Sequence, residues 1–446
     1  MPASPFDSAL YRDLMHDPET ARLLADSAEV RAMLLVEGAL AKVQARQGLI
    51  PETAAAAIQR DALEVVIDPA GLAAGTGQTG VPVPALVAAF RAAMQAPDHA
   101  RFVHHGATSQ DIIDTALVLR LRQMLALWET RLRATLTALA HHADIHAETP
   151  MAGRTWGQIA SPTSFGAVIA AWGTPLIRHL DRLNALRPRL LVVSLSGAVG
   201  SGSALGPDPD GLRADLARTL NLGDPGASWH TARDAIGELA GWIALTTGTL
   251  AKMGKDIALM TASERGEMRL ATSGGSSTMP QKQNPVQPEL LIALAGHTTA
   301  LAAPLLHAQV HAGQRDGAPW FAEWLALPQL CMAMGRATTL ARGLAETIHP
   351  NPDAMLHHID PGSGLIWAEA LSFALAARMP RPEAQAVLKR LCREATAATP
   401  LPALMARDFP GTDWAALCTP ATQWGTAPAQ ARSFARQVRA LPLLAP

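Results

Sequence analysis

Two long stretches of this chain repeat apolar residues at steps of three and four, the spacing of one face of an α-helix. In residues 117–139 and 236–257 these positions are Leu117, Leu121, Met124, Leu125, Trp128, Leu132, Leu136 and Leu139, and then Ile236, Leu239, Ile243, Leu250, Met253 and Ile257. Signals for strands are scarce, since the chain has one Tyr and eight Phe in 446 residues. The second stretch carries Ala, Gly and Thr on its other faces, so we expect other helices around it. The pattern predicts an all-α fold with long, buried helices.

Changes in composition along the chain predict three regions. Residues 1–115 form a mixed helical domain with short helices and the Gly- and Pro-rich stretch GTGQTGVPVP. Residues 116–358 hold the long helices in a central bundle domain, and residues 359–446 form a small C-terminal helical domain. We find no internal repeat of the length that marks solenoid proteins.

The charge balance and the cysteines limit the classes of partner and compartment. Lys plus Arg total 37 and Asp plus Glu total 38, which argues against nucleic acid or an acidic membrane as the main partner. The three cysteines lie far apart, so neither a disulfide framework nor a zinc site is expected, and a reducing cytoplasm fits. The N-terminus lacks the pattern of a signal peptide. The most apolar segments are too short or too interrupted to predict a membrane span.

One segment breaks the helical pattern most sharply, the Gly- and Pro-rich stretch GGSSTMPQKQNPV at 274–286. Gly274 and Gly275 permit backbone conformations that other residues avoid. Two serines follow, and then Lys282 and Asn284. This composition predicts a flexible lid whose Lys and Asn bind an anion.

Three further segments resist a packing explanation alone. In HHGATSQDIIDTA, at 104–116, Thr108 and Ser109 can bind a carboxylate at a helix N-terminus, or Ser109 or Asp111 can simply cap the helix. The segment 151–166 contains Arg154, Thr155, Trp156 and Gln158, which also suit a polar loop with a packed Trp. In 311–324, Arg315 is a candidate anion ligand, and an exposed pair with Asp316 is the alternative.

Two tempting patterns carry little weight. Gly75, Gly77 and Gly80 spell G-x-G-x-x-G, but no strand precedes them, and a dinucleotide site needs strand, turn and helix in that order. His142 and His146 have the spacing of metal ligands without an obvious third ligand. We therefore predict neither a metal nor another cofactor.

Taken in order, the four segments resemble the fumarase/aspartase superfamily. The stretch Gly275-Ser276-Ser277-Thr278-Met279-Pro280-Gln281-Lys282-Gln283-Asn284-Pro285 matches the whole of that superfamily's signature loop. The resemblance implies a mostly α-helical, three-domain subunit. It also implies a homotetramer whose long helices form a twenty-helix core, with each active site shared between three chains.

The resemblance also implies a chemistry and a set of site residues. These enzymes add or remove a group β to a carboxylate, and they must stabilise the dianionic intermediate that forms. By resemblance, Ser276, with Ser277 next, is the catalytic proton-transfer residue, although a free hydroxyl is a weak base at neutral pH. The implied substrate-binding residues are Thr108, Ser109, Arg154, Thr155, Trp156, Gln158, Arg233, Met279, Lys282, Asn284 and Arg315.

Trp156 narrows the choice within the superfamily. The adenylosuccinate lyase branch carries a general-acid His there, because its leaving group needs a proton. A carboxylate needs none, since its conjugate acid has a pKa of about 4. The segments GATSQD, GRTW and SWHTARD resemble the bacterial cycloisomerases that close a lactone on the tricarboxylate 3-carboxy-cis,cis-muconate, in the protocatechuate branch of the β-ketoadipate pathway. The alternatives are an adenylosuccinate-lyase-like C–N lyase, whose acid is His105 or His230, and a non-catalytic structural protein of the same fold.

Overall fold

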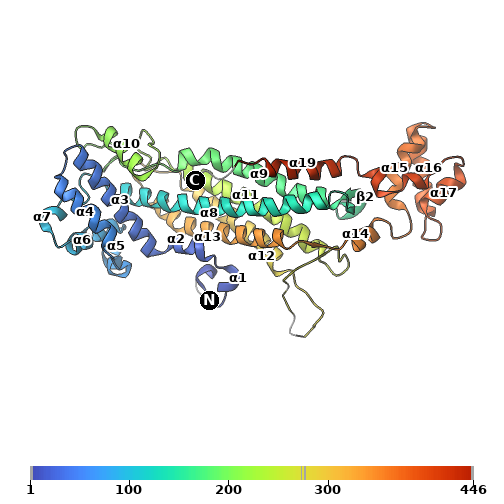
Figure 1. The fold of residues 1–446 in the computed structure, drawn as a ribbon, viewed down its shortest axis with the longest axis horizontal. Helices are drawn as coiled ribbons and strands as arrows, with labels where there is room; N and C mark the ends of the chain where they lie inside the picture. The colour runs from blue at the N-terminus through green and yellow to red at the C-terminus, as the bar shows by residue number, and fades with distance from the viewer. Residues whose placement is uncertain (1–3, 273, 276–277, 443–446) are drawn as a thin grey trace. The chain divides into compact units, whose positions relative to one another are not determined.

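The described part of the chain is almost entirely helical, which confirms the predicted all-α fold (Figure 1). The computed structural model describes residues 4–272, 274–275 and 278–442. The longest helices are α3 (Asp26–Arg46), α8 (Ser109–Ile145), α9 (Phe165–Leu190), α11 (Asp234–Met260), α12 (Val286–His307) and α13 (Gly317–Glu346).

Shorter elements precede and follow these long helices. The short helices before α9 and between α9 and α11 are α1 (Arg12–Met15), α2 (Pro18–Leu24), α4 (Glu52–Glu64), α5 (Ala73–Thr79), α6 (Val83–Ala93), α7 (Pro97–Ala100) and α10 (Pro209–Leu220). Those after α13 are α14 (Pro352–Ile359), α15 (Ala368–Ala376), α16 (Arg381–Glu394), α17 (Leu401–Asp408), α18 (Pro420–Gln423) and α19 (Ala427–Arg439). Two antiparallel strand pairs complete the fold, β1 (Pro150–Thr155) with β2 (Gln158–Ser164) and β3 (Met268–Arg269) with β4 (His349–Pro350).

The apolar faces predicted from the sequence are the buried faces of α8 and α11. All the predicted positions on these two helices are buried except Leu117, which is partly exposed. The rings of Trp128 on α8 and Trp242 on α11 stack with centroids 6.3 Å apart. The Thr247 hydroxyl on α11 lies 2.6 Å from that of Thr298 on α12. Each large apolar side chain buried in this way contributes roughly 1.5–3 kcal/mol.

The backbone contacts divide the chain into two compact units. The first comprises Met1–Arg131, His179–Gly248 and Leu294–Thr339, and the second comprises Leu132–Arg178, Thr249–Ala293 and Leu340–Pro446. The first unit contains a large apolar cluster built mainly from α3, α4, α6 and the start of α8. The second contains a cluster built mainly from α15, α16 and α17. The division into the three regions 1–115, 116–358 and 359–446 stays a prediction.

Helix α12 is long and apolar enough to cross a membrane by length and composition alone. Only 39% of its most apolar window is buried within this chain. The residues left exposed include Ala293, Gly296, Ala300 and Ala303, which recur at helical spacing along one face. The core helix of an assembled globular protein has the same properties.

Candidate active site

Arg315, in the loop between α12 and α13, is bound by groups at the start of α8. Its Nη2 donates hydrogen bonds to the Thr108 hydroxyl at 3.0 Å and to the carbonyl oxygen of Ala198 at 3.1 Å. Its Nε donates to Oε1 of Gln110 at 3.2 Å. Ser109 is the half-buried first residue of α8. The structure thus brings two predicted anion-binding residues, Thr108 and Arg315, into contact across 207 residues of sequence.

The partners of Arg315 are all uncharged. The neighbouring acid, Asp316, accepts hydrogen bonds from the backbone N–H groups of Ala312 and Ala318 instead. In the part of the chain that the structure describes, no carboxylate lies within 4.0 Å of the Arg315 guanidinium. The alternative of an exposed pair between Arg315 and Asp316 is therefore wrong, and Arg315 keeps its positive charge available to a ligand.

The Asp111 carboxylate holds the first turn of α8 in place through hydrogen bonds from nearby backbone N–H groups. Its Oδ2 accepts hydrogen bonds from the backbone N–H groups of Thr108 and Gly197, both at 3.0 Å. Its Oδ1 accepts from the N–H of Ser196 at 2.9 Å and lies 2.9 Å from Nε2 of His230. The backbone N–H of Asp111 donates to the carbonyl oxygen of Thr108 at 3.0 Å, so the Thr108 hydroxyl does not cap the helix and accepts from the guanidinium instead. The side chain of Asp111 therefore caps this helix end, and anion binding by Thr108 stays a prediction.

Arg233, predicted to bind substrate, is a buried structural cation. Its side chain is 1% exposed and lies between Asp114 of α8 and Glu323 of α13. Its guanidinium donates two hydrogen bonds to each carboxylate, at 2.6–3.1 Å. Burial by itself lowers the pKa of Arg233, but the two carboxylates raise it above the ordinary value. Since its donors are committed to these partners, we correct the assignment of Arg233 to a structural role.

The predicted polar segment 151–166 forms the hairpin of β1 and β2, and its tip is Trp156 and Gly157. The register pairs Thr155 with Gln158 across a two-residue turn. Trp156 and Gly157 have φ angles of 54° and 78°, which suit this turn type but are unfavourable for a Trp. Trp156 is fully exposed, and Thr155 and Gln158 are also exposed. The Trp therefore adds nothing to packing within the described chain, so the alternative of a packed Trp is wrong.

Arg154 ties this hairpin to the segment that follows α11. Its guanidinium donates hydrogen bonds of 2.7 and 3.2 Å to the two carboxylate oxygens of Glu267, a fully buried residue. It also lines a cavity of ≈ 340 Å³ together with Lys252, Asp256 and Arg265. Arg154 thus has a carboxylate partner already, unlike Arg315, and its predicted role in substrate binding stays a prediction.

The Gly- and Pro-rich loop is closed at its base by a short antiparallel bridge. Gly274 and Asn284 exchange backbone hydrogen bonds of 2.9 and 3.0 Å. A Cβ atom at Gly274 would lie 2.6 Å from the Val286 side chain, so this position requires glycine. Lys282 and Met279 are exposed, and Asn284 is half-buried. The predicted catalytic residues Ser276 and Ser277 lie outside the described residues.

The patterns discounted in the sequence acquire no site in the structure. The glycines of the G-x-G-x-x-G pattern belong to α5 and its C-terminal cap, rather than to a turn between a strand and a helix. His142 and His146 stack with their ring centroids 6.3 Å apart. Burial, together with the neighbouring histidines, lowers the pKa of His142 to about 4. Among the described residues, no group of three or more His, Cys, Asp or Glu is arranged to hold a metal ion.

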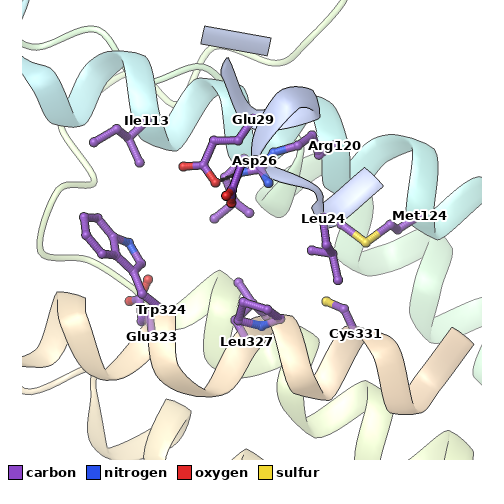
Figure 2. A pocket seen from close by; sticks show the side chains of 12 residues that line it. Leu24, Asp26, Glu29, Ile113, Arg120, Met124, Glu323, Trp324, Leu327 and Cys331 are labelled. Carbon is purple, nitrogen blue, oxygen red and sulfur yellow. Dashed lines mark ion pairs between the residues drawn. The ribbon is translucent and has the colours of Figure 1, made fainter. Parts of the chain in front are cut away.

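A cavity of ≈ 340 Å³ in the first unit contains none of the predicted site residues (Figure 2). Figure 2 shows Trp324 and Leu327 of α13 facing Ile113 and Arg120 of α8. Charged side chains that line this cavity pair with other side chains. Arg120 lies 3.3 Å from Glu29, and Glu323 is paired with Arg233. No pattern in the sequence indicates this cavity.

The sequence analysis also did not identify the polar residues that contact the predicted arginines. Gln110 and Asp114 fall within the singled-out segment 104–116 at a spacing of four, so helical geometry could have placed them on one face. Glu267 and Glu323 had no local signal, because their arginine partners lie 113 and 90 residues away.

Comparisons of the sequence and of the fold with known proteins agree on the class of protein. The model of the lyase family matches residues 12–299. A 3-carboxy-cis,cis-muconate cycloisomerase of Pseudomonas aeruginosa is 40% identical over 84% of this chain and 82% of its own length. A trans-aconitate decarboxylase of Mycosarcoma maydis is 35% identical over 86% of this chain and 78% of its own length. The crystal structure of a 3-carboxy-cis,cis-muconate lactonizing enzyme from Pseudomonas putida superposes with a TM-score of 0.90 at 35% identity, covering 97% of this chain and 100% of that one.

The chain is an all-α enzyme. It belongs to the lyase family, within the fumarase/aspartase superfamily.

Proposed function

We propose that this chain converts 3-carboxy-cis,cis-muconate into γ-carboxymuconolactone by intramolecular addition of a carboxylate, without a metal or another cofactor. The observation that carries the proposal is the contact of Arg315 with Thr108 and Gln110, which leaves a cation beside a helix N-terminus without a carboxylate partner among the described residues. Such a cation suits a substrate with several carboxylates. The likeness to cycloisomerases of the same name supports this substrate.

The reaction requires stabilised negative charge at a carbon atom. One substrate carboxylate oxygen bonds to a carbon of the conjugated diene, and the π electron pair moves to the carbon α to another carboxylate. The resulting intermediate carries the charge of an aci-carboxylate, so donors fixed around it lower the barrier. Arg315 is one such donor, and Lys282 and Asn284 of the 274–286 loop are the others in this proposal.

A proton then neutralises the carbanion, and we assign its transfer to Ser276, with Ser277 as the alternative. The new C–H bond forms as the Ser O–H bond breaks, and water restores the proton to the Ser. This assignment rests on the match of the loop to the superfamily signature. Positive charge nearby favours the ionised hydroxyl, and Lys282 lies in the same loop.

Trp156 in place of a histidine also favours lactone formation. A carboxylate enters and leaves as an anion, so no general acid is needed for it at this position. Of the alternative acids for a C–N lyase, His230 is 1% exposed and paired with Asp111. That environment argues against proton transfer from His230 to a substrate. His105 is exposed and is left as a candidate for the alternative function.

We also propose a cytoplasmic homotetramer whose sites are shared between three chains. Two features support assembly: the exposed face of small residues on α12, and the fully exposed Trp156 at a strained turn. A pair of inactive variants tests site sharing. Mixing unfolded Trp156→Ala and Arg315→Met subunits and refolding them together should restore part of the activity if the two residues serve one site from different chains. No recovery in the mixed refolding would contradict sharing between these two residues.

The direct test supplies 3-carboxy-cis,cis-muconate to the purified protein in the presence of a metal chelator. Loss of the diene absorbance and appearance of the lactone by mass spectrometry are the expected results. Parallel assays with adenylosuccinate and trans-aconitate separate the alternatives. Fumarate release from adenylosuccinate would favour the C–N lyase, and carbon dioxide release from trans-aconitate would favour the activity named for the fungal relative. No turnover of any of the three would favour the non-catalytic protein.

A further inference from the structure

The charge of Arg315 is available because of the neutral groups that surround it. Two of its three partners are a hydroxyl and a backbone carbonyl, which many residues can supply. The third, Oε1 of Gln110, is the one acceptor contributed by a buried side chain. Gln110 is 1% exposed, so solvent does not compete for its amide.

The orientation of the Gln110 amide is fixed by its own partners. Its Nε2 donates to the carbonyl oxygen of His230 at 2.9 Å and to Oδ2 of Asp114 at 3.1 Å. A flipped amide would place its oxygen against these two acceptors and its N–H groups against the Arg315 guanidinium. The hydrogen-bond network therefore allows only the orientation that presents the oxygen to Arg315.

Asp114 is in turn held by Arg233, whose guanidinium donates to it at 2.8 and 3.1 Å. A continuous chain of hydrogen bonds thus runs from the structural cation Arg233 through Asp114 and Gln110 to Arg315. Both Asp114 and Gln110, the middle members of this series of hydrogen bonds, are almost completely buried. The neutral amide of Gln110, at the end of this series of hydrogen bonds, orients the Arg315 guanidinium and leaves its charge intact. A carboxylate at the same place would neutralise that charge.

We propose that Gln110 is the positioning residue that holds Arg315 in place as an uncompensated cation for a carboxylate of the substrate. This inference deepens the proposed function and rests on it for the identity of the substrate. The role of Gln110 is to orient Arg315, and it makes no contact with the reacting atoms.

The test measures anion binding apart from turnover. The probe is propane-1,2,3-tricarboxylate, a non-reactive tricarboxylate, titrated calorimetrically into the wild type and into Gln110→Met, Arg315→Met and Gln59→Met variants. Gln110→Met keeps the length of the side chain and removes its acceptor, so the Kd should rise roughly tenfold. Gln59 of α4 bonds only to a carbonyl of its own helix, at Ala55, so Gln59→Met is a matched control with unchanged binding.

A second variant, Gln110→Glu, separates orientation from charge. As a protonated acid it can donate to Asp114 or His230 and accept from Arg315, much as the amide does. Once ionised, it pairs with Arg315 and faces the carboxylate of Asp114. At neutral pH, probe binding by Gln110→Glu should therefore be weaker than by Gln110→Met, because the ionised side chain also cancels the charge of Arg315. A purely structural role for Gln110 would weaken probe binding equally in the two variants.

The outcomes distinguish this inference from the proposed function. If the wild type fails to lactonise 3-carboxy-cis,cis-muconate but the Gln110 and Arg315 variants still lose probe binding, the function is wrong and the positioning role stands. Equal probe binding by the wild type and Gln110→Met overturns the role, as does absence of saturable binding by the wild type. If Gln110→Met lowers kcat while KM and probe binding stay unchanged, the role is also overturned.

Discussion

Three arginines predicted to bind substrate have different environments. Arg233 lies between two buried carboxylates, and Arg154 is paired with Glu267. Arg315 has only uncharged partners within the described residues. A cation that is already neutralised gains little from a second anion, whereas an uncompensated one gains a full charge-assisted interaction. The environment of each arginine, more than the residue type, therefore favours Arg315 as the anion ligand in the proposed function.

The proposed proton transfer predicts the effect of removing one hydroxyl. Ser276→Ala should lower kcat for lactone formation by roughly three orders of magnitude, as expected for loss of a proton-transfer group. Ser277→Ala is the matched variant and should have a much smaller effect. Steady-state kinetics of both, with circular dichroism to check the fold, decide between them. Near wild-type turnover by Ser276→Ala would move the assignment to Ser277.

An imidazole at position 156 tests whether the reaction needs a general acid there. Trp156→His should not improve lactone formation, because the entering oxygen is already an anion. Trp156 is fully exposed in this chain, so the substitution should leave the fold of the single chain intact, which circular dichroism checks. Comparing kcat/KM with that of Trp156→Phe is the measurement. A large gain for the His variant alone would contradict the absence of a required general acid.

At the scale of single elements, helix ends and short turns carry the candidate site. The start of α8 holds Thr108 through the buried carboxylate of Asp111, and the β1–β2 turn presents Trp156. Asp111 is itself buried, and a functional group supported by a buried side chain keeps its geometry when a ligand binds. Trp156 and its neighbours Thr155 and Gln158 are exposed.

His142, near the C-terminal end of α8, should make the stability of the fold depend on pH. The pKa of His142 is lowered from 6.5 to about 4 by burial and by His141, His146 and His349. Since the unfolded chain binds the proton more tightly, this group destabilises the fold as the pH falls from 6.5 toward 4. His142→Gln should remove this loss, on the order of 1 kcal/mol after allowance for solvent screening. Urea unfolding at several pH values measures it, and the exposed His357→Gln is the control. An unchanged pH profile in His142→Gln would contradict the prediction.

At the scale of the whole molecule, the composition and the unburied helix faces favour assembly. The formal net charge is −1, so copies of the chain do not strongly repel one another. Leu245 and Leu259 on α11 are exposed in the single chain, as are the small residues along one face of α12. Small side chains allow helices to approach closely, and apolar exposure is removed when copies associate.

The proposed assembly predicts that a charge on α12 disrupts it. Ala300→Arg should lower the mass measured by light scattering from that of a tetramer and reduce activity more than about tenfold, because an unpaired charge would be buried at the interface. Ala92→Arg, at an exposed position of α6, is the control and should leave both unchanged. An intact tetramer in Ala300→Arg would show that this face of α12 lies outside the interface.

The sequence by itself determined the helical class, the buried faces of α8 and α11, and the segments that break the helical pattern, because helical periodicity and turn-forming residues are local signals. It also indicated Thr108 and Arg315 as anion ligands without linking them. Only the tertiary structure decided which cations are free: Arg233 and Arg154 meet carboxylates 90 and 113 residues away, and Arg315 meets the amide of Gln110 across 205 residues. Pairing of this kind depends on how distant segments pack, and no local pattern in the chain records it.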